Sequence, residues 1–252
     1  MTQITFDDIY TIGEIVVENA QYRHYHYPEM LIRYDSNFIE FKQLPSLTEF
    51  KEAESYLREY HLKQGQKHVK FYFPANIKPT VELIALLTDT GYEIGFLELY
   101  TIQPKDFPSV RNNPDISIQV VTDDNFEVLL NIQYQHDLSY GSEFAMQKAD
   151  LITRQFEDQN IHQILAFYKG APAGCVDVII SSETAEIDNL TVNEQFRNKG
   201  IGSRLQEFVM ETFPKKNVIL VADGEDTPRE MYKKQSYKYH GFKYEAQKIY
   251  QD

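Results

Sequence analysis

The sequence predicts an α/β (α+β) fold in which a mixed, twisted sheet is flanked by helices and is built from two halves of similar design. Segments that alternate like β-strands follow segments with the periodicity of amphipathic helices along most of the chain. The order helix–strand–helix–strand of residues 47–102 returns in residues 200–250. Because the identity between the halves is low, this pattern alone predicts a weak internal duplication.

Composition excludes several classes of protein. The 252 residues carry 25 Lys and Arg against 38 Asp and Glu, a net charge of −13, which argues against nucleic acid or an anionic membrane as a partner. The single cysteine, Cys175, excludes an internal disulfide and a multi-cysteine metal site, so no metal is expected, and its apolar strand predicts a buried side chain. Neither a transmembrane segment nor a secretory signal is recognisable, so we expect a cytoplasmic protein.

The elements of the first half follow from apolar spacing and from residues typical of helix ends. Pro79 near the start and Gly91 at the end delimit one helix. The expected elements are a hairpin (30–34 and 38–42), a helix (47–65), a strand (68–74), a helix (78–91) and a strand (92–102). His24 and His26 form a close pair without a third ligand nearby, and we interpret them as surface or loop side chains.

Residues 104–115 are expected to link a domain of residues 1–103 to a domain of residues 116–252. This segment holds three prolines and two adjacent asparagines, which disfavour both helix and strand. The second domain should contain a strand (116–121), a helix from Thr122 or Asp123 to about His136, a polar helix to about Gln159, a hairpin (161–180), a strand (185–192), a helix (200–213), a strand (217–223), a helix started by Thr227 and Pro228, and a final strand (242–250).

The most informative segment is the loop before the helix at 200–213. Arg197, Gly200 and Gly202 form the pattern R-x-x-G-x-G, and residues 195–204 hold three basic side chains and no acid in a chain of net negative charge. Glycines allow close backbone approach to a ligand, and the first turn of a helix offers unpaired N–H groups and partial positive charge. A diphosphate site is therefore expected. A glycine-containing turn beside a solvated basic face is the alternative.

The stretch LTV-x4-RNKGIGSRL resembles the acetyl-CoA signature of the GNAT superfamily, the Gcn5-related N-acetyltransferases. The resemblance covers about residues 116–250 and implies a GNAT fold, acetyl-CoA as co-substrate without a metal, and direct transfer of the acetyl group to an amine. It implies that strand backbone pairs with pantetheine, that an amide near Leu190 or Thr191 polarises the thioester carbonyl, and that loop amides hold the pyrophosphate. The implied cofactor-binding residues are Leu190, Thr191, Val192, Arg197, Asn198, Lys199, Gly200, Ile201, Gly202 and Ser203.

The family pattern also implies a tyrosine that protonates the departing thiolate. Tyr232 fits by its place inside the last helix, although Ser236 stands where the family has glycine. Tyr237 is the alternative, because Gly241 and Phe242 then match fully. The other interpretation of either residue is a core tyrosine with its hydroxyl at the surface.

A carboxylate should remove a proton from the amine, directly or through water. Glu186 and Asp188 are two residues apart on one strand, so we expect both on one face together with Leu190 and Val192. Glu186 matches the position of a catalytic glutamate in some members of the family. A solvent-facing or ion-paired acid is the alternative for each.

The resemblance implies a small-molecule or peptide amine as acceptor and places acceptor-binding elements at the loop of residues 136–143. There Asp137, Tyr140 and Glu143 could bind a cation or simply be solvated. The first half is expected to be a degenerate GNAT-like domain, because its corresponding segment, residues 42–50, has Pro45 and no glycine. Homodimer formation stays open. The alternative function is a non-catalytic acyl-CoA sensor or a pseudo-enzyme.

Overall fold

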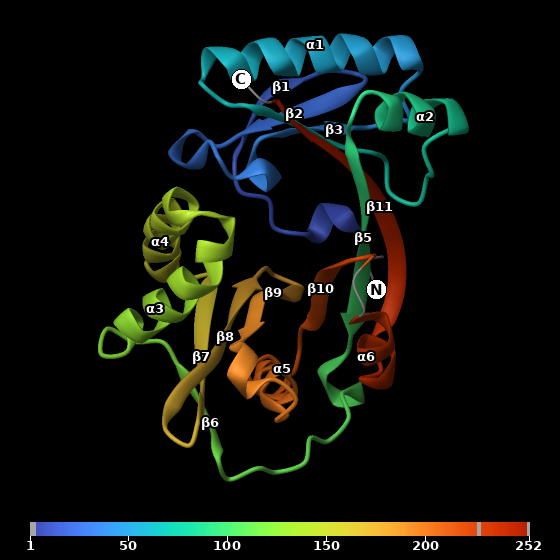
Figure 1. Cartoon of the computed structure of the whole chain (residues 1–252). Coiled ribbons are helices and arrows are strands. Elements are labelled where there is room, and N and C mark those ends of the chain that lie inside the picture. The colour runs from blue at the N-terminus through green and yellow to red at the C-terminus, as the bar shows by residue number, and fades with distance from the viewer. Residues whose placement is uncertain (1–3, 226–227, 251–252) are drawn as a thin grey trace.

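The computed structural model describes residues 4–225 and 228–250 (Figure 1). Within them, the helices are α1 (Leu47–Lys63), α2 (Val81–Asp89), α3 (Phe126–Asp137), α4 (Ser142–Phe156), α5 (Ile201–Thr212) and α6 (Pro228–Lys234). The strands are β1 (Glu14–Glu18), β2 (Tyr22–His26), β3 (Phe38–Phe41), β4 (His68–Tyr72), β5 (Glu93–Ile102), β6 (Ile116–Val120), β7 (Ile161–Tyr168), β8 (Ala171–Ile180), β9 (Thr184–Val192), β10 (Asn217–Asp223) and β11 (Lys238–Ile249). These elements confirm the predicted α/β class.

In the described residues, all of these strands belong to one mixed sheet in the order β1-β2-β3-β4-β11-β5-β10-β9-β8-β7-β6. Strand β11 lies between β4 and β5 and pairs antiparallel with both, while β5 pairs with β10. The last strand of the second half therefore completes the sheet of the first half. Strands from before and after residues 104–115 belong to this one sheet. The division into two domains at that segment stays a prediction.

The beginning of the chain differs from the expectation. Residues 30–34 do not form a strand; Pro28–Met30 and Tyr34–Ser36 are short 3-10 turns. Pro28 favours the first of these turns, because it fixes φ and lacks an N–H donor. The hairpin is made earlier, by β1 and β2. His24 and His26 lie on β2 and are buried, so their interpretation as surface side chains was wrong. Strand alternation turns both rings toward Tyr60 of α1.

The helices of the second half cover both faces of its sheet (Figure 1). Helix α5 packs on one face, where Ile201 and Leu205 contact a cluster that includes Val176 and Ile187. Helices α3 and α4 cover the other face through a cluster that includes Leu129 and Cys175, the latter buried as predicted. In the first half, α1 and α2 pack on a cluster to which Ala246 of β11 contributes. No helix in the described ranges is long and apolar enough to cross a bilayer.

Candidate functional site

The site begins where two parallel strands separate. Strands β9 and β10 pair only from Asn217–Thr184 to Ile219–Glu186, and beyond Glu186 the described residues of the two strands are no longer paired with each other. The separation leaves the edge of β9 from Asp188 to Val192 without a strand partner on that side. Unpaired backbone donors and acceptors at such an edge can bind an extended ligand.

A β-bulge lies at this open edge. Asp177 pairs with Asp188 and Cys175 pairs with Thr191, so β9 carries one extra residue, and Asn189 takes a left-handed conformation with φ of 49°. Gly174 fits here because a Cβ would lie 2.4 Å from the carbonyl oxygen of Thr191. The bulge re-aims the backbone and the side chains that follow it.

The bulge overturns one expectation about the faces of β9. Leu190 and Val192 pack with Ile187 against the α5 side of the sheet. Glu186 and Asp188 line a cavity instead. The expected common face of all four residues was wrong, because one inserted residue shifts the alternation of every side chain after it.

The loop from β9 to α5 leaves backbone donors open. Asn198 and Gly200 have φ of 63° and 86°, and Gly200 stands at the N-cap without a side-chain cap. The first backbone bond of the helix runs from the N–H of Arg204 to the oxygen of Gly200 at 3.0 Å. In the described part of the chain, the N–H groups of residues 201–203 have no backbone acceptor. These N–H groups form the positive end of the α5 helix dipole, which therefore faces the loop.

The predicted cofactor residues surround this helix end. A Cβ placed on Gly202 would lie 3.7 Å from Leu190 and 3.8 Å from Val192, so the helix start and the strand edge are adjacent. Arg197 is exposed and pairs with Glu194 at 3.3 Å, and the Lys199 ammonium lies 5.3 Å from the centre of the Tyr168 ring. A cavity of about 580 Å³ lies at this edge, and its lining includes Thr191, Val192, Asn193 and Arg197 together with Gln135 and His136.

The two predicted carboxylates line a second cavity, of about 660 Å³. Glu186 is 7% exposed, and its Oε2 accepts a hydrogen bond of 2.8 Å from the backbone N–H of Tyr10. Burial raises the pKa of Glu186 to about 8; the bond from Tyr10 opposes the rise and the charge of Asp188 adds to it. Asp188 is half-buried and accepts from the N–H of Asn189 at 2.9 Å.

The two tyrosine candidates lie beside each other but in different surroundings. Tyr232 on α6 is half-buried, with its ring 5.1 Å from Tyr100 and 5.4 Å from Tyr237. Tyr237 is buried, its hydroxyl donates to Gln206 at 2.9 Å, and burial raises its pKa far above the usual value. The expected N-cap of this helix, Thr227, lies outside the described residues.

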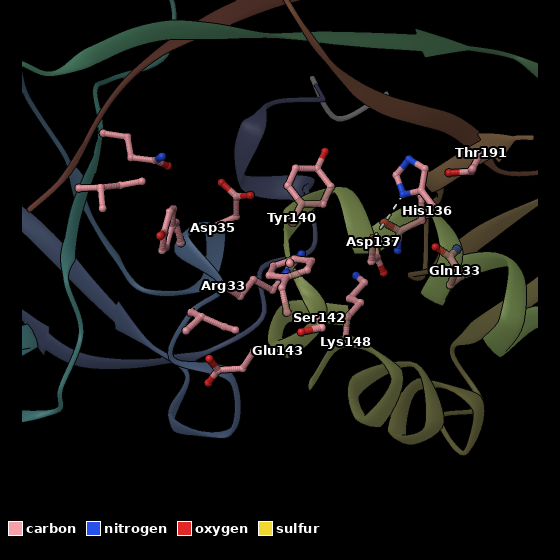
Figure 2. Close-up of a pocket in the computed structure, with 17 residues that line it drawn as sticks. Arg33, Asp35, Gln133, His136, Asp137, Tyr140, Ser142, Glu143, Lys148 and Thr191 are labelled. Carbon is pink, nitrogen blue, oxygen red and sulfur yellow. Dashed lines mark hydrogen bonds and ion pairs between the residues drawn. The ribbon is translucent and has the colours of Figure 1, made fainter. Parts of the chain in front are cut away.

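A third cavity, of about 900 Å³, opens where the bulge faces the first half (Figure 2). Asp137, Tyr140 and Glu143 line it, together with Asn189 and Thr191 of β9. Residues that the sequence did not single out line it as well: Arg33, Asp35, Gln133, His136, Ser142 and Lys148. The cavity shares His136 and Thr191 with the groove beside α5, and Arg33 and Asp35 with the cavity at Glu186. The three hollows therefore meet around the bulge.

Polar side chains lie beneath the bulge. Asp177 is buried, accepts a hydrogen bond of 2.7 Å from the Asn189 amide, and has a pKa that burial raises to about 6. Gln133 donates to the Cys175 sulfur at 3.1 Å. Burial raises the pKa of this thiol well above its usual value, which argues against a thiolate nucleophile. Among the described residues, no group of three or more His, Cys, Asp or Glu side chains could hold a metal ion.

Comparisons with known families match the two halves separately. The model described as the acetyltransferase (GNAT) family matches residues 129–237, and a domain of unknown function, DUF5613, matches residues 4–100. The chain is similar to a functionally unknown conserved protein from Staphylococcus epidermidis, with 34% identity over 98% of both chains and a TM-score of 0.91. No curated protein matches.

Two more distant solved structures share the fold. One is a GCN5-related N-acetyltransferase from Kribbella flavida, with 13% identity, coverage of 93% of this chain and 89% of the other, and a TM-score of 0.60. The other is a tandem GNAT protein from the clavulanic acid biosynthesis pathway, with 12% identity, coverage of 84% and 75%, and a TM-score of 0.55. The second likeness fits an arrangement of two GNAT-like halves in one chain.

Proposed function

We propose that this chain, which belongs to the acetyltransferase (GNAT) family, is an N-acetyltransferase. It transfers an acetyl group from acetyl-CoA directly to a primary amine. The observation that carries the proposal is the combination of an open, bulged edge on β9 with an uncapped helix start at Gly200. The loop amides suit a pyrophosphate, and the strand edge suits an extended chain that ends at the bulge.

The residues present fit the roles that the transfer requires. Acetyl-CoA supplies an activated acyl group when it is bound. The backbone N–H groups at the bulge, near Leu190 and Thr191, are placed to stabilise negative charge on a carbonyl oxygen. Glu186 or Asp188 accepts the proton that the amine loses as its nitrogen bonds to the acyl carbon. Tyr232 donates a proton to the sulfur that leaves.

The two cavities near the bulge support a division of labour between the halves. The second half provides the cofactor groove and the carboxylates on β9. The first half provides Arg33 and Asp35, which line both acceptor-side cavities. We propose that the first half shapes the acceptor cleft and does not bind a second CoA.

Binding of acetyl-CoA tests the first part of the proposal. Titration calorimetry should give micromolar affinity for the wild type and no detectable binding for Gly202→Trp, because the indole fills the space beside Leu190 and Val192. Val81→Trp is the matched control, since Val81 is 82% exposed on α2 and far from the loop in sequence. Equal binding by wild type and Gly202→Trp would remove the loop as the cofactor site.

The acid assignment can be tested with paired tyrosine variants. Tyr232→Phe should reduce turnover by about 10²-fold or more at unchanged acetyl-CoA affinity, because general acid groups contribute on that scale. Tyr237→Phe should mainly reduce stability, because the hydroxyl of Tyr237 bonds Gln206 in the core. The reverse pattern would assign the role to Tyr237.

A second candidate function, acyl-CoA binding without transfer, is favoured by one observation. The backbone N–H of Tyr10 already donates a hydrogen bond to Glu186 Oε2, and Glu186 is almost fully buried. A screen of primary amines with thiol release as the readout separates the candidates. Release of CoA that depends on an amine supports transfer, whereas tight binding of acetyl-CoA without release for any amine supports the sensor.

A further inference from the structure

The cavity of about 900 Å³ contains two cationic side chains that form no ion pair with any described residue. Lys148 of α4 is 5% exposed, and Figure 2 shows it extending toward Asp137 and His136. In the described part of the chain its ammonium makes no hydrogen bond and no ion pair within 4.0 Å. Arg33 enters from the first half, and its guanidinium bonds the Ser36 hydroxyl at 2.5 Å without an ion pair among the described residues.

These two cations lie close enough to affect each other. Burial lowers the pKa of Lys148, and the charge of Arg33 lowers it further. Two neighbouring cations at one cavity repel each other, and an anion bound between them would relieve this repulsion. Lys and Arg with open donors form strong, charge-assisted hydrogen bonds to a carboxylate. This side of the cavity is therefore suited to an anionic group of a ligand.

The groups that face Lys148 are mixed in sign. Asp137, Asp177 and Asp188 act on it electrostatically, yet none forms an ion pair with it. Asp137 Oδ2 and Asp177 Oδ1 are buried acceptors without a hydrogen-bond partner in the structure. Asp137 lines the same cavity, and its Oδ1 lies 3.3 Å from His136 Nδ1. The cavity thus offers acceptors for an ammonium close to donors for a carboxylate.

We propose that the acceptor is a zwitterion, an α-amino acid or another primary amine that carries a carboxylate, whose carboxylate binds Lys148 and Arg33. This inference rests on the proposed acetyl transfer and names its substrate class. The amine then lies on the side of Asp137, Asp188 and the bulge, where Thr191 lines both this cavity and the cofactor groove. A polyamine, which has only cationic groups, would bring positive charge against Lys148 and Arg33.

The carboxylate site can be tested by equilibrium binding, without acetyl transfer. N-acetyl-L-amino acids and the corresponding N-acetyl-L-amino acid amides differ only in the carboxylate, so a panel of such pairs isolates its contribution. Calorimetry or thermal shift at neutral pH should show that at least one acid binds the wild type about tenfold tighter than its amide. In Lys148→Met the preference should fall to about one, because Met keeps the length of the side chain and removes the charge.

Two further variants complete the design. Arg33→Gln can retain a hydrogen bond to Ser36 but loses the charge. It should therefore reduce the preference for the N-acetyl-amino acid over its amide. Lys63→Met is the matched control, because Lys63 is an exposed lysine of α1 that pairs with Glu59. Acetyl-CoA affinity should be unchanged in all three variants.

The outcomes separate this inference from the proposed function. If no acid binds better than its amide, or if Lys148→Met keeps the preference, the zwitterion is excluded even when acetyl-CoA binds normally. If acetyl-CoA fails to bind while the acids still show the preference, acetyl transfer fails and the carboxylate site stands. Turnover of polyamines in place of amino acids would also overturn the inference.

Discussion

The two halves place a helix after a strand in the same way, but they start that helix differently. In the first half, β3 leads through α1 to the parallel strand β4; in the second, β9 leads through α5 to the parallel strand β10. Helix α1 starts at Ser46 with a complete capping box, in which Ser46 and Glu49 each bond the backbone N–H of the other. Helix α5 starts at Gly200 with no side-chain cap.

The difference shows how one helix start becomes structural and the other remains available to a ligand. At α1 the carboxylate of Glu49 supplies the negative charge that the helix end favours, and the bond from the Ser46 N–H lowers the pKa of that carboxyl. Gln21 donates a further hydrogen bond to Glu49 at 2.9 Å. The first half therefore has a built-in anion where the second half has an open site.

The largest expected effect tests whether the acid–base groups belong to the second half alone. If the acid–base chemistry resides on β9, Glu186→Gln should reduce turnover by about 10²–10⁴-fold with acetyl-CoA affinity unchanged. Glu183→Gln, an exposed position just before β9, is the control. Steady-state kinetics with any amine that is turned over gives the result. An unchanged rate for Glu186→Gln would shift the role of base to Asp188.

The next effect gives α5 an anion of its own. Ser203→Glu places a carboxylate at the third helical position, as Glu49 stands in α1, and should weaken acetyl-CoA binding roughly 30-fold or more by competing for the helix end. Ser203→Gln introduces a side chain of nearly the same shape as glutamate but without the charge. This variant should bind acetyl-CoA with an affinity within a few-fold of the wild type. Equal affinities of the two variants would mean that the pyrophosphate does not bind this helix end.

A smaller effect concerns the pH dependence of the first half. Burial, assisted by neighbouring histidines, lowers the pKa of His24 and His68 to about 3 and that of His61 to about 4. The unfolded chain protonates these residues below about 6.5 and the folded chain does not, so stability is present above pH 6.5 and is lost as the pH falls toward 4. Each group should cost roughly 1 kcal/mol per pH unit in this window.

Denaturation of wild type and His24→Phe across this pH range measures the effect. The free energy of unfolding should fall less steeply for the variant. The contribution of Glu186 to the pH dependence of stability has the opposite sign. Because its pKa is raised, it contributes stability that is lost as the pH rises through about 8. Parallel slopes for the two proteins below pH 6.5 would contradict the assignment to His24.

The smallest effect tests the closed helix start. Ser46→Ala removes one cap bond and should lower the free energy of unfolding by about 1 kcal/mol without any change in acetyl-CoA affinity. Chemical denaturation measures the first quantity and calorimetric titration the second. A loss of cofactor affinity in this variant would show that the first half takes part in cofactor binding.

Much of this architecture could be predicted because local patterns determine it. The loop around Gly200 and Gly202, the strand before it and the buried Cys175 are all readable from spacing and residue type. The bulge could not be predicted, because one inserted residue leaves composition and hydropathy almost unchanged. The one indication of the bulge in the sequence is Asn189, because asparagine tolerates the left-handed conformation.

The contribution of the first half to the cleft also escaped prediction, because Arg33 and Asp35 reach it through tertiary packing. Lys148 left a clearer signal. It lies on the same helical stripe as Ala145 and Ile152, and a lysine on an apolar stripe indicates a buried charge. The aromatic and histidine-rich strand β2 has no aliphatic residue, which is why its burial was missed.

The position of β11 has a consequence for how the protein is made. Strand β5 ends at Ile102, but the strand that separates it from β4 begins at Lys238. During synthesis β4 and β5 emerge early and must wait, with edges unpaired, until the chain from Lys238 to Ile249 has been made. Chains that stall or are cut before Lys238 should therefore be prone to aggregation and dependent on chaperones.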